Sequence, residues 1–205
     1  MKICYIVGAG DFDTVFTPSE EDLVIAADGG YDHLTKSGIR CDLFLGDFDS
    51  ARVMPSGVET MRFPVEKDET DMHLAYLEGY KRGYRHFRLY GGTGGRCDHT
   101  FANYSLLLYG KKQGCEVSLV DSGSECFAIR NEKIALSPRE NTNLSVFAIG
   151  GEAEGVSICG AYYSCEDVTL TPDFPLGVSN SFKGEPVLIE VKRGALLIML
   201  VCEKK

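Results

Sequence analysis

The sequence lacks the features that mark zinc proteins, secreted proteins and membrane proteins. It has no Trp and only 4 His in 205 residues, and its 8 Cys include no C-x-x-C pair and no Cys/His spacing typical of zinc. No apolar run approaches the roughly 18 residues that span a bilayer, and residues 1–10 lack the basic segment and cleavage site of a signal peptide. These absences predict a cytoplasmic protein with no membrane partner, in which most cysteines are buried thiols.

Basic residues are also scarce, and the deficit is uneven. The 21 Lys and Arg against 30 Asp and Glu give a net charge of −9, and residues 1–71 alone hold 6 basic and 15 acidic residues, a balance of −9. Nucleic-acid binding depends mainly on Lys and Arg neutralising phosphates, so this acidic block argues against a nucleic-acid partner. A divalent metal is the better candidate ligand.

The remaining composition is that of a folded globular chain, with 44% apolar and 25% charged residues. Residues 1–121 alternate short apolar runs with helix-like segments, which predicts a mostly parallel sheet with crossover helices. The expected strands are 3–7, 23–27, 43–45, 86–90 and 117–120. One expected helix runs from the N-cap Thr70 to about Arg82, and another from Asp98 to near Gly114.

The pattern changes near residue 122. Short β-rich runs follow at 126–130, 144–149, 168–170, 187–191 and 196–201, without a long helical pattern. Asn131-Glu132 and Arg193-Gly194 are typical of hairpin turns, which favours a small antiparallel sandwich or barrel. No long Pro, Gly or Ser linker separates the two parts. We therefore predict an α/β domain at 1–122 packed against an all-β domain at 123–205.

Acidic residues cluster where the predicted strands end. Asp28, Asp47 and Asp49 directly follow expected strands, and Asp68 and Asp71 lie at an expected helix start. Ligands of parallel sheets bind outside the carboxyl ends of the strands, and carboxylates that converge there need a cation to stay ionised together. Oxygen-only ligands suit Mg²⁺. Taken singly, each acidic residue is also typical of a turn, a cap or the first turn of a helix.

A glycine-rich segment follows the expected strand at 86–90. Residues 91–99 read Gly-Gly-Thr-Gly-Gly-Arg-Cys-Asp-His, so backbone N–H groups can approach a phosphate closely at a helix start. The segment is neither a Walker A loop nor a dinucleotide fingerprint. Arg96 offers a planar fork for phosphate, Asp98 orients it or begins the helix, and His99 and Asn103 share a helix face. A flexible turn with a capping Asp is the alternative.

Residues 177–182, Gly-Val-Ser-Asn-Ser-Phe, form the main polar cluster of the second half and by themselves favour a bulge or turn. Taken with the acidic and glycine-rich motifs in this order, they resemble the thiamine pyrophosphokinase family over nearly the whole chain. The resemblance implies an α/β domain followed by a β-sandwich, in a homodimer with its active site between the subunits. It implies transfer of the terminal pyrophosphoryl unit of ATP to the hydroxyethyl group of thiamine, which gives thiamine diphosphate and AMP, with Mg²⁺ as cofactor.

The resemblance also implies roles for individual residues. The expected metal ligands are Asp28, Asp47, Asp49 and Asp71, and the expected ATP-binding residues are Asp68, Thr70, Gly94, Gly95, Arg96, His99 and Asn103. The expected catalytic residues are Asp71, Arg96 and Asp98, and the expected thiamine-binding residues are Ser179, Asn180 and Phe182. Some family members present an aromatic residue, often Trp, to the thiamine rings after Ser-Asn. Because this chain has no Trp, Phe182 is the candidate substitute.

Two other functions stay open. The first is a pyrophosphokinase that acts on another heterocyclic alcohol, such as a pterin-type molecule, and only the C-terminal pocket would distinguish it. The second is a catalytically inactive regulator that binds thiamine or a nucleotide. Release of AMP would separate an enzyme from such a regulator.

Overall fold

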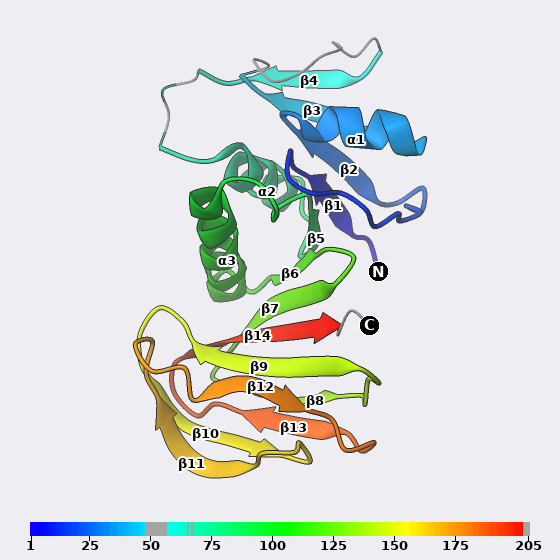
Figure 1. The fold of residues 1–205 in the computed structure, drawn as a ribbon. Helices are drawn as coiled ribbons and strands as arrows, with labels where there is room; N and C mark the ends of the chain where they lie inside the picture. The colour runs from blue at the N-terminus through cyan, green and yellow to red at the C-terminus, as the bar shows by residue number, and fades with distance from the viewer. Residues whose placement is uncertain (48–56, 65, 67, 203–205) are drawn as a thin grey trace. The chain divides into compact units, whose positions relative to one another are not determined.

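The structure is a computed structural model that describes residues 1–47, 57–64, 66 and 68–202. The chain folds as two compact units (Figure 1). Unit 1 comprises Met1–Leu106 and Gly114–Ser122, and unit 2 comprises Leu107–Gln113 and Gly123–Lys205. None of the helices in the described ranges is both long enough and apolar enough to cross a membrane.

Unit 1 is built on a parallel sheet. Its described residues form β1 (Cys4–Val7), β2 (Leu23–Ala27), β3 (Leu43–Gly46), β4 (Glu59–Arg62), β5 (His86–Tyr90) and β6 (Glu116–Val120), in the spatial order β6-β5-β1-β2-β3-β4. Strands β1, β2 and β3 are buried along their whole length, as their uninterrupted apolar runs require when both faces of a sheet are covered. The exposed edge strand β4 has no apolar run, so the sequence pattern does not predict it.

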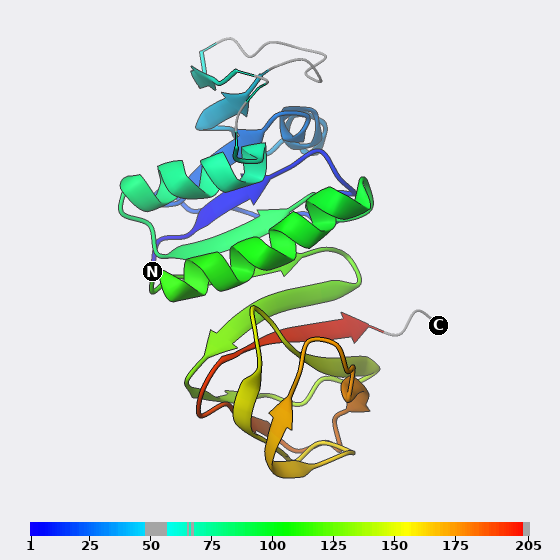
Figure 2. The same ribbon diagram turned by 90° about the vertical axis from the view of Figure 1, so that its left-hand side faces the viewer.

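Helices cover both faces of this sheet (Figures 1 and 2). α1 (Gly30–Ser37) lies on one face, and α2 (Asp71–Lys81) lies on the other with the start of α3 (Cys97–Lys112) beside it. The Thr70 side chain accepts a hydrogen bond from the backbone N of His73 at 3.2 Å, which confirms the predicted N-cap. α3 begins one residue before the expected Asp98, and α1 was not among the expected helices.

The order of the strands reverses between β1 and β5. From β1 the chain moves through β2 and β3 to β4 at one edge, and then returns to β5 and β6 on the other side of β1. The loops that leave β1 and β5 are hydrogen-bonded to each other, from Gly8 N to Tyr90 O and from Gly10 N to Gly91 O, both at 2.8 Å. In an open α/β sheet such a switch point is the usual place for a ligand.

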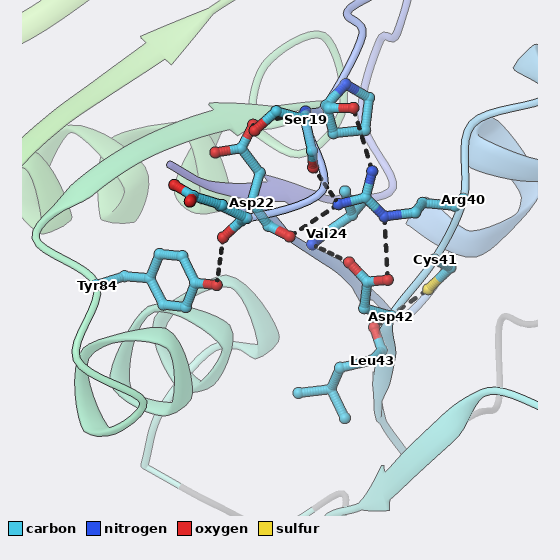
Figure 3. Close-up of polar contacts among 10 residues, drawn as sticks. Ser19, Asp22, Val24, Arg40, Cys41, Asp42, Leu43 and Tyr84 are labelled. Atoms are coloured by element: carbon cyan, nitrogen blue, oxygen red, sulfur yellow. Dashed lines mark hydrogen bonds and ion pairs between the residues drawn. The ribbon is translucent and has the colours of Figure 1, made fainter. Parts of the chain in front are cut away.

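The amino ends of β1, β2 and β3 are joined by carboxylates (Figure 3). Asp22, which is 9% exposed, accepts hydrogen bonds from Ile3 N at 2.7 Å, from Ser19 N at 2.8 Å and from the Ser19 hydroxyl at 2.7 Å. Asp42 accepts one from Val24 N at 2.8 Å. A buried carboxylate with as many donors as Asp22 is stabilised in its ionised form.

Arg40 ties the two segments of this network together (Figure 3). Its Nε donates to Asp42 Oδ1 at 3.2 Å, and its Nη2 donates to the backbone carbonyls of Ser19 at 2.7 Å and Asp22 at 2.8 Å. Burial alone would raise the pKa of Asp22, but the hydrogen bonds from Ile3 and Ser19 and the charge of Arg40 together lower it below its ordinary value. The amino edge is therefore a closed polar network.

Unit 2 is an antiparallel sandwich. Its described strands are β7 (Ser124–Arg130), β8 (Lys133–Leu136), β9 (Thr142–Ala148), β10 (Ala153–Cys159), β11 (Cys165–Leu170), β12 (Gly177–Ser181), β13 (Val187–Glu190) and β14 (Ala195–Cys202). They form two layers, β12-β9-β14-β7 and β11-β10-β13-β8. Buried side chains from both layers, such as Leu144, Ile158 and Ile198, make one shared core.

Both predicted hairpin turns are wrong. β7 pairs with β14 and β8 pairs with β13, so Asn131-Glu132 and Arg193-Gly194 are corners at which the chain passes from one layer to the other. The two corners hold each other, because Gly194 N donates to Asn131 Oδ1 at 2.9 Å and Asn131 N donates to Gly194 O at 3.2 Å. Turn-type residues mark a change of direction but do not specify which strands pair.

The predicted fold class, a mostly parallel α/β domain followed by an antiparallel all-β domain, is confirmed. The expectation that most cysteines are buried is wrong. All 8 are free thiols, but only Cys4, Cys115 and Cys126 are buried.

Candidate functional site

A pocket of about 310 Å³ lies at the switch point of unit 1. Residues that follow the carboxyl ends of β1, β2 and β5, with the first turns of α2 and α3, line it. The structure brings together seven of the predicted metal, ATP-binding and catalytic residues there, namely Asp28, Thr70, Asp71, Gly95, Arg96, His99 and Asn103. The carboxyl edge of the sheet thus gathers carboxylates, glycines and a guanidinium around one space.

The floor of the pocket is made by two glycine segments packed backbone to backbone. A Cβ on Gly10 would overlap the carbonyl oxygens of Gly91 and Thr93, and one on Gly8 would meet the Met72 side chain. Because these glycines carry no side chains, the two loops pack closely and a ligand can approach their main-chain atoms. Gly8 and Gly10 were missed by the sequence reasoning, although Gly-Ala-Gly directly after the apolar run at 3–7 was the available signal.

Asn103 holds one of these segments in place. It is 5% exposed, and its Nδ2 donates to Gly92 O at 2.8 Å. A Cβ on Gly92 would meet this amide at 2.9 Å and Leu119 at 2.6 Å. Asn103 and His99 both line the pocket, as their spacing on one helix face predicts, but the Asn103 amide is committed to the glycine loop.

Asp28 and Asp71 supply the carboxylates of the pocket. Asp28 follows β2 with a left-handed φ of 47°, a conformation that residues other than glycine adopt at some cost in energy. A Cβ on Gly46 would meet Asp28 at 3.3 Å, so the ends of β2 and β3 lie close together. Asp71 is the first residue of α2, where the Thr70 cap fixes its position. Strained residues of this kind cluster at ligand sites.

The other predicted acidic residues are not gathered there. Asp47 is half-buried directly after β3 and Asp68 is exposed, and neither lines the pocket. Asp49 lies outside the described residues. Among the residues that the structure describes, no three His, Cys, Asp or Glu side chains are grouped closely enough to hold a metal ion.

Arg96 and Asp98 form a fork-like ion pair at the start of α3. Arg96 Nη2 lies 2.6 Å from Asp98 Oδ2 and Arg96 Nε lies 3.2 Å from Asp98 Oδ1, with the side chains 73% and 60% exposed. The hydrogen bonds from Arg96 lower the pKa of Asp98 to about 2. Asp98 does not line the pocket, whereas Arg96 does, so Asp98 orients the guanidinium. Gly94, just before Arg96, has a φ of 79°, and a Cβ there would overlap the Asp11 carboxylate.

The three residues predicted to bind thiamine lie on or next to β12 in unit 2. Ser179 is exposed, whereas Asn180 is 5% exposed and both the oxygen and the nitrogen of its amide are hydrogen-bonded. Asn180 Oδ1 accepts from Tyr163 N and Ser181 N, both at 2.9 Å, and its Nδ2 donates to Tyr163 O at 2.7 Å. Phe182 lines a second pocket, of about 340 Å³, formed with the segment 138–143 and with Ser181 and Gly184.

Asn180 thereby holds the backbone of Tyr163, which with its neighbour Tyr162 was missed by the sequence reasoning. Tyr162 and Tyr163 are 61% and 67% exposed, and their rings meet edge to face with centroids 5.1 Å apart. Lys183 Nζ lies 5.5 Å from the Tyr162 ring centroid, which leaves Tyr163 as the more open ring. Two adjacent tyrosines between β-rich runs were the available signal, but neighbouring aromatics are equally common in cores.

The chain matches two family models. One, described as thiamin pyrophosphokinase, catalytic domain, matches residues 15–119, and the other, described as thiamin pyrophosphokinase, vitamin B1 binding domain, matches residues 131–196. A curated relative, the thiamine pyrophosphokinase of Bacillus subtilis, is 25% identical over 210 residues, which cover 97% of this chain and 98% of that protein.

Solved structures are similar over the same extent. The thiamine pyrophosphokinase structure from Bacillus subtilis has a TM-score of 0.88 at 22% identity and covers 98% of this chain and 100% of its own. The structure from Geobacillus thermodenitrificans has a TM-score of 0.83 at 23% identity over 99% of both chains. The yeast structure has a TM-score of 0.73 at 15% identity, over 98% of this chain and 86% of its own. At these sequence identities the similarity shows that the fold is shared.

Proposed function

Because the chain belongs to the thiamin pyrophosphokinase family and is therefore a transferase, we propose that it transfers the pyrophosphoryl group of ATP to the hydroxyethyl group of thiamine. The products are thiamine diphosphate and AMP. The observation that carries this proposal is the pocket at the switch point between β1 and β5, where glycine segments, Arg96 and the carboxylates of Asp28 and Asp71 surround a single space. Glycine loops with a guanidinium suit phosphate, and carboxylates beside them suit a metal shared with it.

Mg²⁺ is the proposed cofactor, and the donor chemistry fits it. Asp28 and Asp71 offer hard oxygen ligands, and Mg²⁺ is typically held by one or two carboxylates together with substrate phosphates and water. Two carboxylates are therefore enough to hold the ion. Asp47 and Asp49, the other two predicted ligands, remain proposed as additional ones. Bound in this way, Mg²⁺ would neutralise charge on the ATP phosphates.

The proposed reaction is an in-line displacement. The thiamine hydroxyl oxygen bonds to the β-phosphorus of ATP, and the bond from that phosphorus to the oxygen bridging to the α-phosphate breaks, so that AMP leaves with the electron pair. A primary alcohol is a weak nucleophile, so positioning and charge neutralisation by Arg96 supply most of the rate. The alcohol proton passes to a carboxylate. Asp71 is the better candidate base, because it lines the pocket, whereas Asp98 lies outside the lining and is paired with Arg96.

On the thiamine side we assign Ser179 to direct contact and Tyr163 to stacking. The thiazolium ring of thiamine is a cation, and a tyrosine face attracts a cation. Tyr163 is 67% exposed with its backbone held by Asn180, so Asn180 acts on thiamine through Tyr163. Phe182 is an alternative aromatic contact. We further propose a homodimer with the site between subunits, which sedimentation or light scattering would test.

The proposal is tested by incubating purified protein with ATP, Mg²⁺ and thiamine, and measuring AMP and thiamine diphosphate together, with an EDTA control. Equal amounts of both products, formed only with the metal, are expected. AMP without thiamine diphosphate would point to a different acceptor or to water. Thiamine binding without turnover would favour the inactive regulator, and ADP as product would contradict pyrophosphoryl transfer.

A further inference from the structure

Ser179 occupies an unusual backbone conformation in β12. Its φ is 57°, in the left-handed region that serine rarely adopts. The register of β12 on β9 shifts between the pairs Gly177 with Val146 and Asn180 with Leu144, so the strand bulges at residues 178 and 179. Bulges of this kind redirect a side chain and are common beside active sites.

A buried hydroxyl holds this bulge. Ser145 on β9 is 8% exposed, and its Oγ accepts the backbone N–H of Ser179 at 3.1 Å. On the exposed side, the Ser179 hydroxyl makes no hydrogen bond within the part of the chain that the structure describes. The backbone of Ser179 is therefore fixed while its functional group faces outward.

The other layer of unit 2 contains a second left-handed residue whose backbone N–H is accepted by a serine hydroxyl, but its side chain is used differently. Asp167 on β11 has a φ of 52°, and its N–H is accepted by the hydroxyl of Ser157 on β10 at 3.1 Å. The Asp167 carboxylate is used within the fold, in an ion pair with Lys192 at 2.7 Å. At the Asp167 bulge the side chain stabilises the protein, whereas at the Ser179 bulge the side chain is available to a ligand.

We propose that Ser145 is a positioning residue for thiamine, which holds Ser179 in its left-handed conformation so that the Ser179 hydroxyl meets the polar edge of the aminopyrimidine ring. This inference rests on the proposed function. The aminopyrimidine edge carries both donors and acceptors, and a serine hydroxyl can complement either. Ser145 itself does not touch the substrate, and it acts through the backbone of Ser179.

The test compares Ser145→Ala with Ser157→Ala in the full chain. Ser145→Ala should raise the KM for thiamine about tenfold, the loss expected of one well-placed hydrogen bond, with the KM for ATP unchanged. Ser145→Thr keeps the hydroxyl and should restore the KM for thiamine. Ser157→Ala removes the matched hydroxyl and should leave both KM values unchanged. If Ser157→Ala raised the KM for thiamine equally, or Ser145→Ala left it unchanged, the inference would be wrong.

A second variant separates ligand contact from folding. Ser179→Gly relieves the strained φ, so it should raise the melting temperature while also raising the KM for thiamine. A variant that is less stable and binds thiamine normally would contradict a ligand-facing role. The wild-type protein tests the proposed function on which this inference rests. If the wild type forms no thiamine diphosphate, the proposed function and this inference are both wrong. If the wild type turns over normally and the variants are unaffected, only this inference is wrong.

Discussion

The two edges of the parallel sheet in unit 1 use carboxylates in different ways. At the amino edge, Asp22 and Asp42 accept hydrogen bonds from the backbone at the starts of the strands, and Arg40 completes the network. At the carboxyl edge, Asp28 and Asp71 line a pocket together with Arg96 and two glycine segments. Both sets lie in the same acidic third of the sequence, and composition alone does not distinguish them.

The amino edge of the sheet therefore contributes to stability, and the carboxyl edge is the place for ligand binding. At the amino edge the carboxylates bond to donors of the fold itself, Asp22 to Ile3 and Ser19 and Asp42 to Val24 and Arg40. The carboxyl edge instead combines a strained Asp28, glycines in close contact and the exposed guanidinium of Arg96. Open α/β sheets bind ligands at this edge, so mutations at the two edges should differ in which quantity they change.

Replacing Asp71 by Asn should give the largest effect. It removes a pocket carboxylate proposed to hold Mg²⁺ and accept the proton, so turnover should fall about 10³-fold. The free energy of unfolding should change by about 1 kcal/mol or less, the contribution of one acidic residue at a helix start. Measured AMP release and urea unfolding check both numbers. Asp173→Asn, an exposed acid in unit 2, is the control, and near-normal turnover of Asp71→Asn at saturating Mg²⁺ would remove the metal assignment.

Asp22→Asn should produce the opposite pattern at the amino edge. The new amide N–H group faces the donors of Ser19, so the free energy of unfolding should fall by about 3 kcal/mol. Turnover per folded molecule should stay within about twofold, since the pocket lies at the other edge. Urea unfolding and the product assay at a temperature where the variant is folded measure the two. A large loss of turnover in Asp22→Asn would show that the amino edge also affects catalysis, which would contradict the proposed difference between the two edges.

Two left-handed glycines sharpen the comparison further. Gly38 caps α1 with a φ of 65° and open space around it, and Gly94 has a φ of 79° against the Asp11 carboxylate. Replacing either by Ala should cost roughly 1–2 kcal/mol of stability from the backbone alone. Only Gly94→Ala must also displace the loop beside Arg96, so it should raise the KM for ATP roughly tenfold. Equal KM values in the two variants would show that the loop is not a phosphate site.

The smallest expected effect is that of acid on the free energy of unfolding, through Asp22 at the amino edge. The pKa of Asp22 is lowered in the folded protein below its ordinary value of 3.8, so the unfolded chain binds the proton more tightly. The stability that Asp22 contributes is complete above that ordinary value and is lost as the pH falls below it. Urea unfolding between pH 5 and about pH 3 should therefore be steeper in pH for the wild type than for Asp22→Asn. Parallel curves would assign the acid sensitivity to other groups.

The sequence predicts those parts of this molecule that depend on local pattern. The buried runs at 23–27 and 86–90 match β2 and β5, and Thr70 caps α2 as its hydroxyl suggests. The family resemblance and the fold class are confirmed as well. These features depend on the burial of apolar runs and on capping, which act over a few residues.

Features that depend on pairing over long distances were not predictable in the same way. The corners at Asn131 and Gly194 look like hairpin turns until the partners of β7 and β14 are known. Likewise, nothing in the sequence around Asn180 indicates that its amide is committed to Tyr163, 17 residues away. Local chemistry identifies a polar residue as important, but only the fold decides whether it meets a ligand or holds its neighbour.

The place of β14 in unit 2 has a consequence for synthesis of the protein. β14 lies between β9 and β7 and carries Leu196, Ile198 and Leu200 into the core, although it follows every other strand of the unit in the chain. A ribosome must therefore translate past residue 202 before β7 and β9 find their common partner. Until then one edge of β7 and one edge of β9 lack the partner that they have in the folded protein, and unpaired strand edges of this kind promote aggregation.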